Sequence, residues 1–183
     1  MEIINIMAII ESKRMRKILV DGDYTLWEYT PSLIKPLYDD IDPLSLIRRI
    51  RLMIEKIQGG YKVFYLEVNG VLVGYNVFAP GGRRLKCSTK QDLVDGPSFV
   101  ASEQRGKGYV TTLKKMVLNN CCSDYNYVYG WISKNNIPSI KACIKAGFDV
   151  EYGELRIEGL MRNLKQVPKG EGTNVIIRYR IPK

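Results

Sequence analysis

Residues 98–110 read SFVASEQRGKGYV and combine a short apolar strand, a polar corner and a basic Gly-Lys-Gly turn that opens into a helix. The first turn of a helix presents unpaired N–H groups and the positive end of the helix dipole. Glycine at that position lets a phosphate approach the backbone closely. The segment therefore predicts an anion site at the start of the helix that follows Gly108.

The glycine spacing separates this turn from two common nucleotide-binding loops. A Walker loop needs G-x-x-x-x-G-K followed by Ser or Thr, and the turn lacks that spacing. A dinucleotide-binding fingerprint would need a third glycine where Thr111 stands. A lone G-x-G also occurs in plain strand-to-helix corners, so the surrounding sequence has to identify the anion.

Strand and helix patterns continue downstream of the turn. The helix after Gly108 is expected to bury an apolar face and to direct Lys114 and Lys115 toward solvent. Loops are expected over residues 160–171. The other expected elements are strands over 125–132, 148–157 and 174–181 and a helix from Asn135 to Gly147.

Upstream of the turn, the sequence predicts an amphipathic helix and a hairpin. Asp42-Pro43 is expected to begin the helix, with its apolar residues inward and its arginines mostly on the other side, and Gly59-Gly60 to end it. Asn69-Gly70 supplies the positive φ angles of a type I′ turn. The remaining upstream elements are two strands between Arg16 and Tyr29, strands over 61–68 and 71–78, a loop over 83–96 and a strand over 97–101.

Length and composition predict a single globular domain over residues 1–183. Of the 183 residues, 45% are hydrophobic and 26% charged, and strands and helices alternate as in a mixed α/β domain. Histidine is absent, which excludes Ser–His–Asp catalysis and histidine metal sites. The net charge of +9 suits a polyanionic ligand, although ordinary solubility charge explains it equally well.

The cysteines and the N-terminal residues bear on the compartment. The four cysteines have no C-x-x-C spacing, so no zinc or other metal site is expected. The apolar run over residues 3–10 is too short to span a membrane, and no signal-peptide cleavage pattern follows it. We therefore expect free thiols and a cytoplasmic location.

Two ordered motifs resemble one known family. Residues 100–110, VASEQRGKGYV, resemble the acetyl-CoA motif of the GNAT N-acetyltransferases, R-x-x-G-x-[GA] after a strand. Residues 136–148, NIPSIKACIKAGF, resemble the N-x-x-S-I…K-x-G-F helix and strand of the same family. Both motifs lie at the family's spacing, which is more specific than either motif alone.

The resemblance implies an α/β (α+β) fold with a mixed, largely antiparallel central sheet, flanked by helices and with splayed central strands. It implies that the pyrophosphate of acetyl-CoA sits on the N–H groups of residues 105–110 and that its pantetheine arm pairs with residues 99–101. The partner strand across the resulting slot would be 125–132. The implied cofactor-binding residues are Phe99, Val100, Ala101, Arg105, Gly106, Lys107, Gly108, Tyr109, Val110, Asn136 and Lys145.

The implied reaction is direct transfer of an acetyl group from acetyl-CoA to an acceptor amine. The amine would belong to a small molecule, such as an amino sugar, a polyamine or an amino acid, or to a protein. Without histidine, the base must be a carboxylate, a tyrosine or a water chain. The catalytic candidates are Glu67, Asp95 and Cys143, with Asp92 close to the same strand; packing or capping is the alternative role of each.

Two departures from the family pattern leave another interpretation open. Val110 replaces the last glycine or alanine of the first motif, and Cys143 stands where many relatives carry a tyrosine that can protonate the leaving thiolate. A catalytically weak or inactive CoA-binding module with a sensing or interaction role would fit the same motifs.

The expected partners are an acyl-CoA and an amine acceptor. The acceptor site is expected to form from residues 31–57, 83–95 and 160–171. A basic nucleic-acid binder would show steeply salt-dependent affinity, but no recognition motif is visible in the sequence. We therefore expect neither nucleic acid nor membrane as a partner, and a monomer or homodimer.

Overall fold

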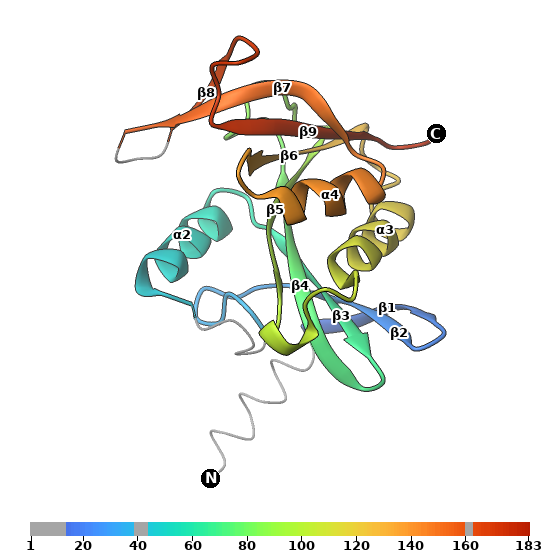
Figure 1. The fold of residues 1–183 in the computed structure, drawn as a ribbon. Coiled ribbons are helices and arrows are strands. Elements are labelled where there is room, and N and C mark those ends of the chain that lie inside the picture. The colour runs from blue at the N-terminus through green and yellow to red at the C-terminus, as the bar shows by residue number, and fades with distance from the viewer. Residues whose placement is uncertain (1–13, 39–43, 160–162) are drawn as a thin grey trace.

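A computed structural model describes residues 14–38, 44–159 and 163–183 of the chain. The described residues form one nine-stranded sheet in the order β1-β2-β3-β4-β5-β6-β9-β7-β8, with helices on both faces (Figure 1). The strands are β1 (Met15–Asp21), β2 (Tyr24–Tyr29), β3 (Lys62–Val68), β4 (Val71–Pro80), β5 (Leu93–Val100), β6 (Tyr127–Ser133), β7 (Asp149–Glu158), β8 (Asn163–Val167) and β9 (Asn174–Arg180). The helices are α2 (Leu46–Ile57), α3 (Tyr109–Cys121) and α4 (Ile137–Lys145), with a short 3₁₀ turn, η1 (Ser102–Gln104).

The sheet opens at its centre. Neighbouring strands are antiparallel except β5 and β6, which are parallel. These two strands pair only between residues 93–95 and 128–130, although both continue well beyond that point and diverge (Figure 1). The expected mixed, largely antiparallel sheet with splayed central strands is therefore confirmed.

The β3–β4 hairpin follows from its turn residues. Asn69 and Gly70 have φ angles of 50° and 81°, as a type I′ turn requires. The hairpin places β4 at the middle of the sheet, where it becomes the antiparallel neighbour of β5. This local signal therefore fixes one side of the central opening.

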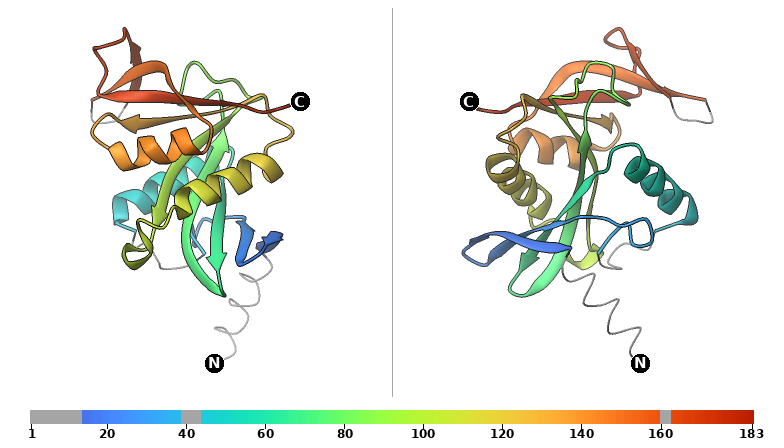
Figure 2. Two further views of the ribbon diagram at one scale, coloured as in Figure 1. Left: turned by 45° about the vertical axis from the view of Figure 1, so that its right-hand side comes forward. Right: turned by 180° about the vertical axis from the view of Figure 1, so that it is seen from behind.

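Helices α3 and α4 lie on one side of the sheet and α2 on the other (Figure 2). The main core packs between the sheet and α3 and α4, where Leu113 and Val117 of α3 meet Val128 of β6. A second, tyrosine-rich core around Tyr29, Tyr65 and Tyr75 lies apart from it, with Leu52 of α2 packed against it. No helix in the described ranges has both the length and the apolar character needed to cross a membrane.

Two strands differ from the sequence expectation. Strand β5 begins at Leu93, inside the segment expected to be a loop, because residues 93–95 pair with β6. Strand β8 lies inside the second expected loop. Among the described strands it lies at the edge of the sheet and pairs only with β7, and most of its side chains are exposed. An edge strand of this kind carries little hydrophobic alternation, so nothing in its sequence distinguishes it from a loop.

Helix α2 is reversed relative to the sequence expectation. Leu46 and Ile57 of its apolar stripe are 73% and 72% exposed, and no residue of the helix is fully buried. Ser45 caps its N-terminus by accepting a hydrogen bond from Arg48 N at 3.4 Å. The expected cap at Asp42-Pro43 and the apolar run over residues 3–10 lie outside the described residues.

Candidate functional site

The Gly-Lys-Gly turn forms the expected helix start. Gly106 and Gly108 both have a φ of 81°, a left-handed conformation that residues with a side chain adopt only at a cost. Gly108 is the N-cap of α3, and the first bond of its ladder runs from Thr112 N to Gly108 O at 3.1 Å. The N–H groups of Tyr109, Val110 and Thr111 therefore have no acceptor within the helix.

The two basic side chains of the turn behave differently. Arg105 Nε donates to Val100 O at 3.1 Å, and its guanidinium lies 5.8 Å from the centre of the Phe99 ring. Arg105 thus ties the turn to the end of β5. Lys107 is exposed and its Nζ donates to the neutral amide oxygen Oε1 of Gln104 at 2.9 Å, an exposed contact that an anion can replace.

The end of β5 offers backbone groups toward the opening. Ala101 N donates to Val73 O of β4 at 3.0 Å. Because backbone groups alternate in direction along a strand, those of Phe99 and Ala101 face β4, and those of Ser98 and Val100 face away from it. Arg105 already occupies the Val100 carbonyl, while the Phe99 ring stacks on Tyr75 with centroids 5.8 Å apart.

A cavity of about 280 Å³, termed the slot, lies between the diverging strands and the starts of α3 and α4. Val110, Lys114, Asn136 and Cys143 are among its lining residues. Asn136 also caps α4, since its Oδ1 accepts from Ser139 N at 3.3 Å. Lys145 is exposed at the opposite end of α4 and does not line the slot.

A second cavity, about 390 Å³ and termed the arginine pocket, is walled by α2, β4, β5 and the residues after β4. It takes residues from each segment expected to form the acceptor site, including Leu37, Arg83 and Leu164. The slot and the arginine pocket share Asp95, Gly96, Pro97, Trp131 and Ile157 as lining residues. The two cavities therefore meet where β5 and β6 part.

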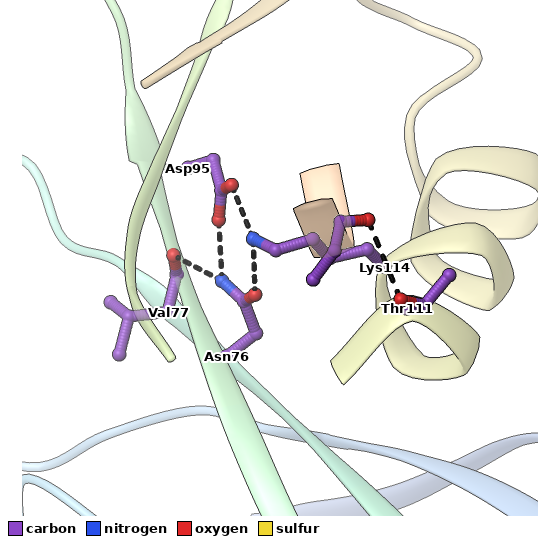
Figure 3. A network of polar contacts seen from close by, with 6 residues as sticks. Asn76, Val77, Asp95, Thr111 and Lys114 are labelled. Carbon is purple, nitrogen blue, oxygen red and sulfur yellow. Dashed lines mark hydrogen bonds and ion pairs between the residues drawn. The ribbon is translucent and has the colours of Figure 1, made fainter. Parts of the chain in front are cut away.

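A buried ion pair stands at this junction (Figure 3). Lys114 Nζ of α3 contacts Asp95 Oδ2 and donates to Asn76 Oδ1 at 2.9 Å, while Asn76 Nδ2 donates to Asp95 Oδ1 at 2.6 Å. The side chains of Lys114 and Asp95 are only 4% and 3% exposed. Two opposite charges and one amide satisfy each other inside the protein, as buried charges require.

The expectation that Lys114 faces solvent is therefore wrong. Lys114 lies four residues after Val110 and three before Val117, so the helical spacing places it on the buried face of α3. Its charge suggested an outward direction, but the opposing carboxylate of Asp95 sits on β5, 19 residues away in sequence. The helical spacing is therefore the sequence signal that indicates a buried position for Lys114. The sequence carries no comparable signal for Asn76.

The catalytic candidates lie in different surroundings. Glu67 accepts from Trp27 Nε1 at 3.1 Å and lines neither cavity. Asp92 accepts from Thr89 N at 2.7 Å and Tyr127 N at 3.2 Å, contacts that fold the β4–β5 connection. Asp95 lines both cavities but is committed to Lys114 and Asn76.

Cys143 is buried on α4 and lines the slot. Burial raises the pKa of its thiol to about 11, against the opposing effect of the Lys114 charge. The thiol is therefore protonated at neutral pH. Within the described ranges, no three His, Cys, Asp or Glu side chains gather to hold a metal ion.

Solved structures match this arrangement, although no family model and no curated protein sequence matches the chain. A candidate GNAT acetyltransferase from Desulfovibrio desulfuricans superposes with a TM-score of 0.55, covering 92% of this chain and 98% of that one at 12% identity. The chain has the GNAT fold. Two further acetyltransferase structures extend the comparison.

The first is yncA of Salmonella typhimurium, a candidate acetyltransferase solved with acetyl-CoA, which matches with a TM-score of 0.57 at 16% identity. The match covers 88% of this chain and 96% of yncA. The second is a spermidine N-acetyltransferase from Vibrio cholerae in complex with CoA and spermine. It has a TM-score of 0.56 and 15% identity, over 88% of this chain and 97% of that one. The GNAT fold therefore extends over most of the chain, with little sequence similarity.

Proposed function

We propose that the chain is an acetyl-CoA-dependent N-acetyltransferase that transfers the acetyl group directly to an acceptor amine. The observation that carries this proposal is the meeting of two cavities at the parting of β5 and β6. One cavity begins at a phosphate-binding type of helix start, and the other opens on the opposite side of β5. Each cavity can hold one of two substrates, with their reacting atoms at the shared wall.

The chain's backbone would bind the cofactor. The N–H groups at the start of α3 would hold the pyrophosphate, each contributing about 1.5–3 kcal/mol to a charged acceptor. Lys107 would add a positive charge, and Arg105 would hold the turn against β5. The backbone of Ser98, on the edge that faces away from β4, would pair with the pantetheine amides.

The transfer step needs one bond to form and one to break. The neutral amine nitrogen attacks the thioester carbonyl carbon, the C–N bond forms, and the C–S bond breaks with its electron pair on sulfur. The amine loses one proton to the solvent of the arginine pocket, and the departing thiolate gains one. Cys143 lines the slot as a protonated thiol and is the proposed donor of that proton, to be reprotonated from solvent.

Calorimetry with acetyl-CoA and a thiol-release assay with an amine panel test the proposal. We expect binding of acetyl-CoA and release of free CoA with at least one amine. The double variant Arg105→Glu/Lys107→Glu should raise the KM for acetyl-CoA more than the KM for the acceptor. Lys90→Glu, an exposed change that touches neither cavity, is the matched control. Absence of acetyl-CoA binding would refute the proposal.

A CoA-binding module without catalysis is the second candidate. The observation that favours it is the engagement of Asp92 and Asp95 in internal contacts, which leaves neither carboxylate available as a base without rearrangement. This candidate predicts acetyl-CoA binding without thiol release for any amine in the panel. The same two measurements therefore separate the two functions.

A further inference from the structure

Helix α2 directs Arg48 and Glu55 toward the protein beside Leu52, whereas most of its apolar residues are exposed. Arg48, Arg51 and Glu55 are spaced three and four residues apart, so they share one face, and all three line the arginine pocket. Leu46 and Ile57 lie on the opposite face and are exposed. A helix whose charges served only solvation would have the reverse orientation. Two of the three arginines of α2, Arg48 and Arg51, are therefore placed to line a cavity.

Two of the pocket's arginines are held in place by neighbours. Arg48 Nη2 donates to Tyr75 OH at 3.1 Å. Arg84 pairs with Glu55 at 3.0 Å, and its guanidinium lies 5.6 Å from the centre of the Trp131 ring. Arg84 thus spans the pocket from α2 to β6. These contacts fix the guanidinium groups on the pocket wall.

The other two arginines have no counter-charge in the described ranges. Arg51 comes from α2, and Arg83 from the residues after β4. Neither forms an ion pair with any residue that the structure describes. The Arg83 guanidinium packs against Gly59, at the point where a Cβ atom would stand. The guanidinium groups of both residues border the cavity and are able to bind an anion.

The carboxylates of the pocket do not balance these charges. Glu55 is already paired with Arg84, and Asp95 is buried against Lys114. The rest of the lining is largely apolar or aromatic, as at Tyr61, Val77 and Trp131. A volume of about 390 Å³ falls within the range of small-molecule sites. Among the described residues that line it, the pocket therefore combines an apolar body with four arginines against two carboxylates.

We propose that the acceptor amine carries an anionic group, a carboxylate or a phosphate, which binds the arginines of this pocket. The inference rests on the proposed acetyltransferase function and names its substrate class. The anion would bind Arg51 and Arg83, and the apolar part of the acceptor would lie on Val77 and Trp131. Its amine would then point toward the junction at Asp95–Pro97. A polyamine would meet the same arginines as like charges and would be disfavoured.

Matched acceptor pairs test the substrate class on the full chain. Phenylalanine and phenethylamine differ by a carboxylate, and O-phosphoethanolamine and ethanolamine differ by a phosphate. We expect kcat/KM to be at least about 10-fold higher for the anionic member of one pair, with spermidine below both. The pair that shows the preference identifies the anion as carboxylate or phosphate. Equal rates within both pairs, or a preference for spermidine, overturn the inference.

Variants assign the effect to the pocket. Arg51→Ala and Arg83→Ala should each raise the KM for the preferred acceptor by roughly 10- to 100-fold while leaving the KM for acetyl-CoA unchanged. Arg49→Ala is the matched control because Arg49 is exposed on the same helix and lines neither cavity. Equal effects of Arg49→Ala and Arg51→Ala would contradict the proposed contact.

Product binding separates this inference from the proposed function. Calorimetry with N-acetylphenylalanine against N-acetylphenethylamine, and with the acetylated phosphate pair, needs no turnover. If an anionic product binds in an arginine-dependent way but acetyl-CoA does not bind, the proposed transferase function is refuted and the anion site is retained. Turnover with a preference for uncharged or cationic acceptors would support the transferase function and refute the anion site. Product binding without any anion preference in either pair overturns the inference directly.

Discussion

The slot and the arginine pocket are built from different materials. Val110 at the start of α3 lines the slot, and the turn just before it carries two glycines with positive φ angles beside the unpaired backbone N–H groups of the helix start. The arginine pocket relies on side chains brought together from α2, the residues after β4 and the distant strands. A backbone site recognises a phosphate in the same way in any chain, whereas a side-chain site can differ from one chain to the next. Under the proposed function, the slot would recognise a common donor and the arginine pocket a particular acceptor.

The largest expected effect comes from the ion pair that separates the two cavities. Lys114→Met leaves the Asp95 carboxylate buried without its positive partner, which should lower the free energy of unfolding by about 3–5 kcal/mol. Urea denaturation followed by circular dichroism measures this loss. Both cavities should lose ligand binding together, because Asp95 lines each of them.

The double variant Lys114→Met/Asp95→Asn provides the control for that effect. Without either charge, much of the lost stability should return, since the main penalty is the unpaired buried carboxylate. Lys115→Met, one position along the same helix and exposed, should cost little. A double variant as unstable as Lys114→Met would show that the cluster matters for its shape rather than for its charge.

A second prediction separates the chemistry proposed for the slot from the ligand binding proposed for both cavities. Cys143→Ala should lower kcat about 100-fold if the thiol donates the proton to the leaving thiolate, with acetyl-CoA affinity nearly unchanged. The pKa of about 11 means that the wild-type thiol stays protonated across the neutral range and loses its proton only as the pH rises toward 11. Stopped-flow thiol release over pH 7–10 measures kcat. A kcat equal to that of the wild-type protein in the Cys143→Ala variant would assign Cys143 to packing alone.

The slot and the arginine pocket also differ in how far the sequence predicted them. The helix start at Gly106 and Gly108, where the anion site is proposed, depends on a few consecutive residues, so local spacing is sufficient to predict it. The arginine pocket depends on which way α2 turns, and hydrophobic spacing gave the opposite orientation. That spacing identifies the two faces of a helix, but tertiary contacts decide which face lies against the protein.

The charge of Lys114 likewise led to a wrong prediction, because it suggested an exposed side chain. Lysine on a helix is usually exposed, and only the fold brings Asp95 and Asn76 to Lys114. Strand β8 was missed because an exposed edge strand carries few hydrophobic side chains. The parting of β5 and β6 came from the family resemblance and not from any residue pattern. Local sequence patterns thus do not predict contacts between residues that are distant in the sequence.

A third prediction concerns a variant that should weaken ligand binding in the slot without changing ligand binding in the arginine pocket. Gly108→Val forces a β-branched residue into a left-handed conformation and places side-chain atoms where the anion would approach. The Kd for acetyl-CoA should rise by about 10-fold or more, measured by calorimetry, while acceptor-product binding is unchanged. Gly22→Val imposes a similar backbone penalty in the β1–β2 turn, far from both cavities, and should leave both affinities intact.

The smallest expected effect lies outside both cavities. Glu154 of β7 accepts from Gly170 N at 3.0 Å and Gly172 N at 2.8 Å and pairs with Lys134 at 2.7 Å. The hydrogen bond from Lys134 and those from the two backbone N–H groups lower the pKa of Glu154 to about 2. Because the folded pKa lies below the ordinary value, this carboxylate stabilises the fold above pH 4.5 and loses that effect as the pH falls toward 2.

Glu154→Gln should therefore lower the Tm at pH 7 slightly and flatten its decline between pH 4.5 and 2. Glu151→Gln, on the same strand but exposed, is the matched control and should leave the acid limb unchanged. Thermal melts across this pH range measure both. Activity at pH 7 should be unaltered in either variant, since neither residue lines a cavity.

The two halves of the sheet meet through only three residue pairs, between 93–95 of β5 and 128–130 of β6. Beyond that short seam, each strand has an edge that no strand of the described residues completes. A ligand arm with amide groups can act there as a missing strand and become part of the sheet. Amide hydrogen exchange near the seam should then slow on ligand binding, while exchange in β1 and β2 at the far edge stays the same. Under the proposed function, the opening that would admit the cofactor is also the place where the cofactor would complete the sheet.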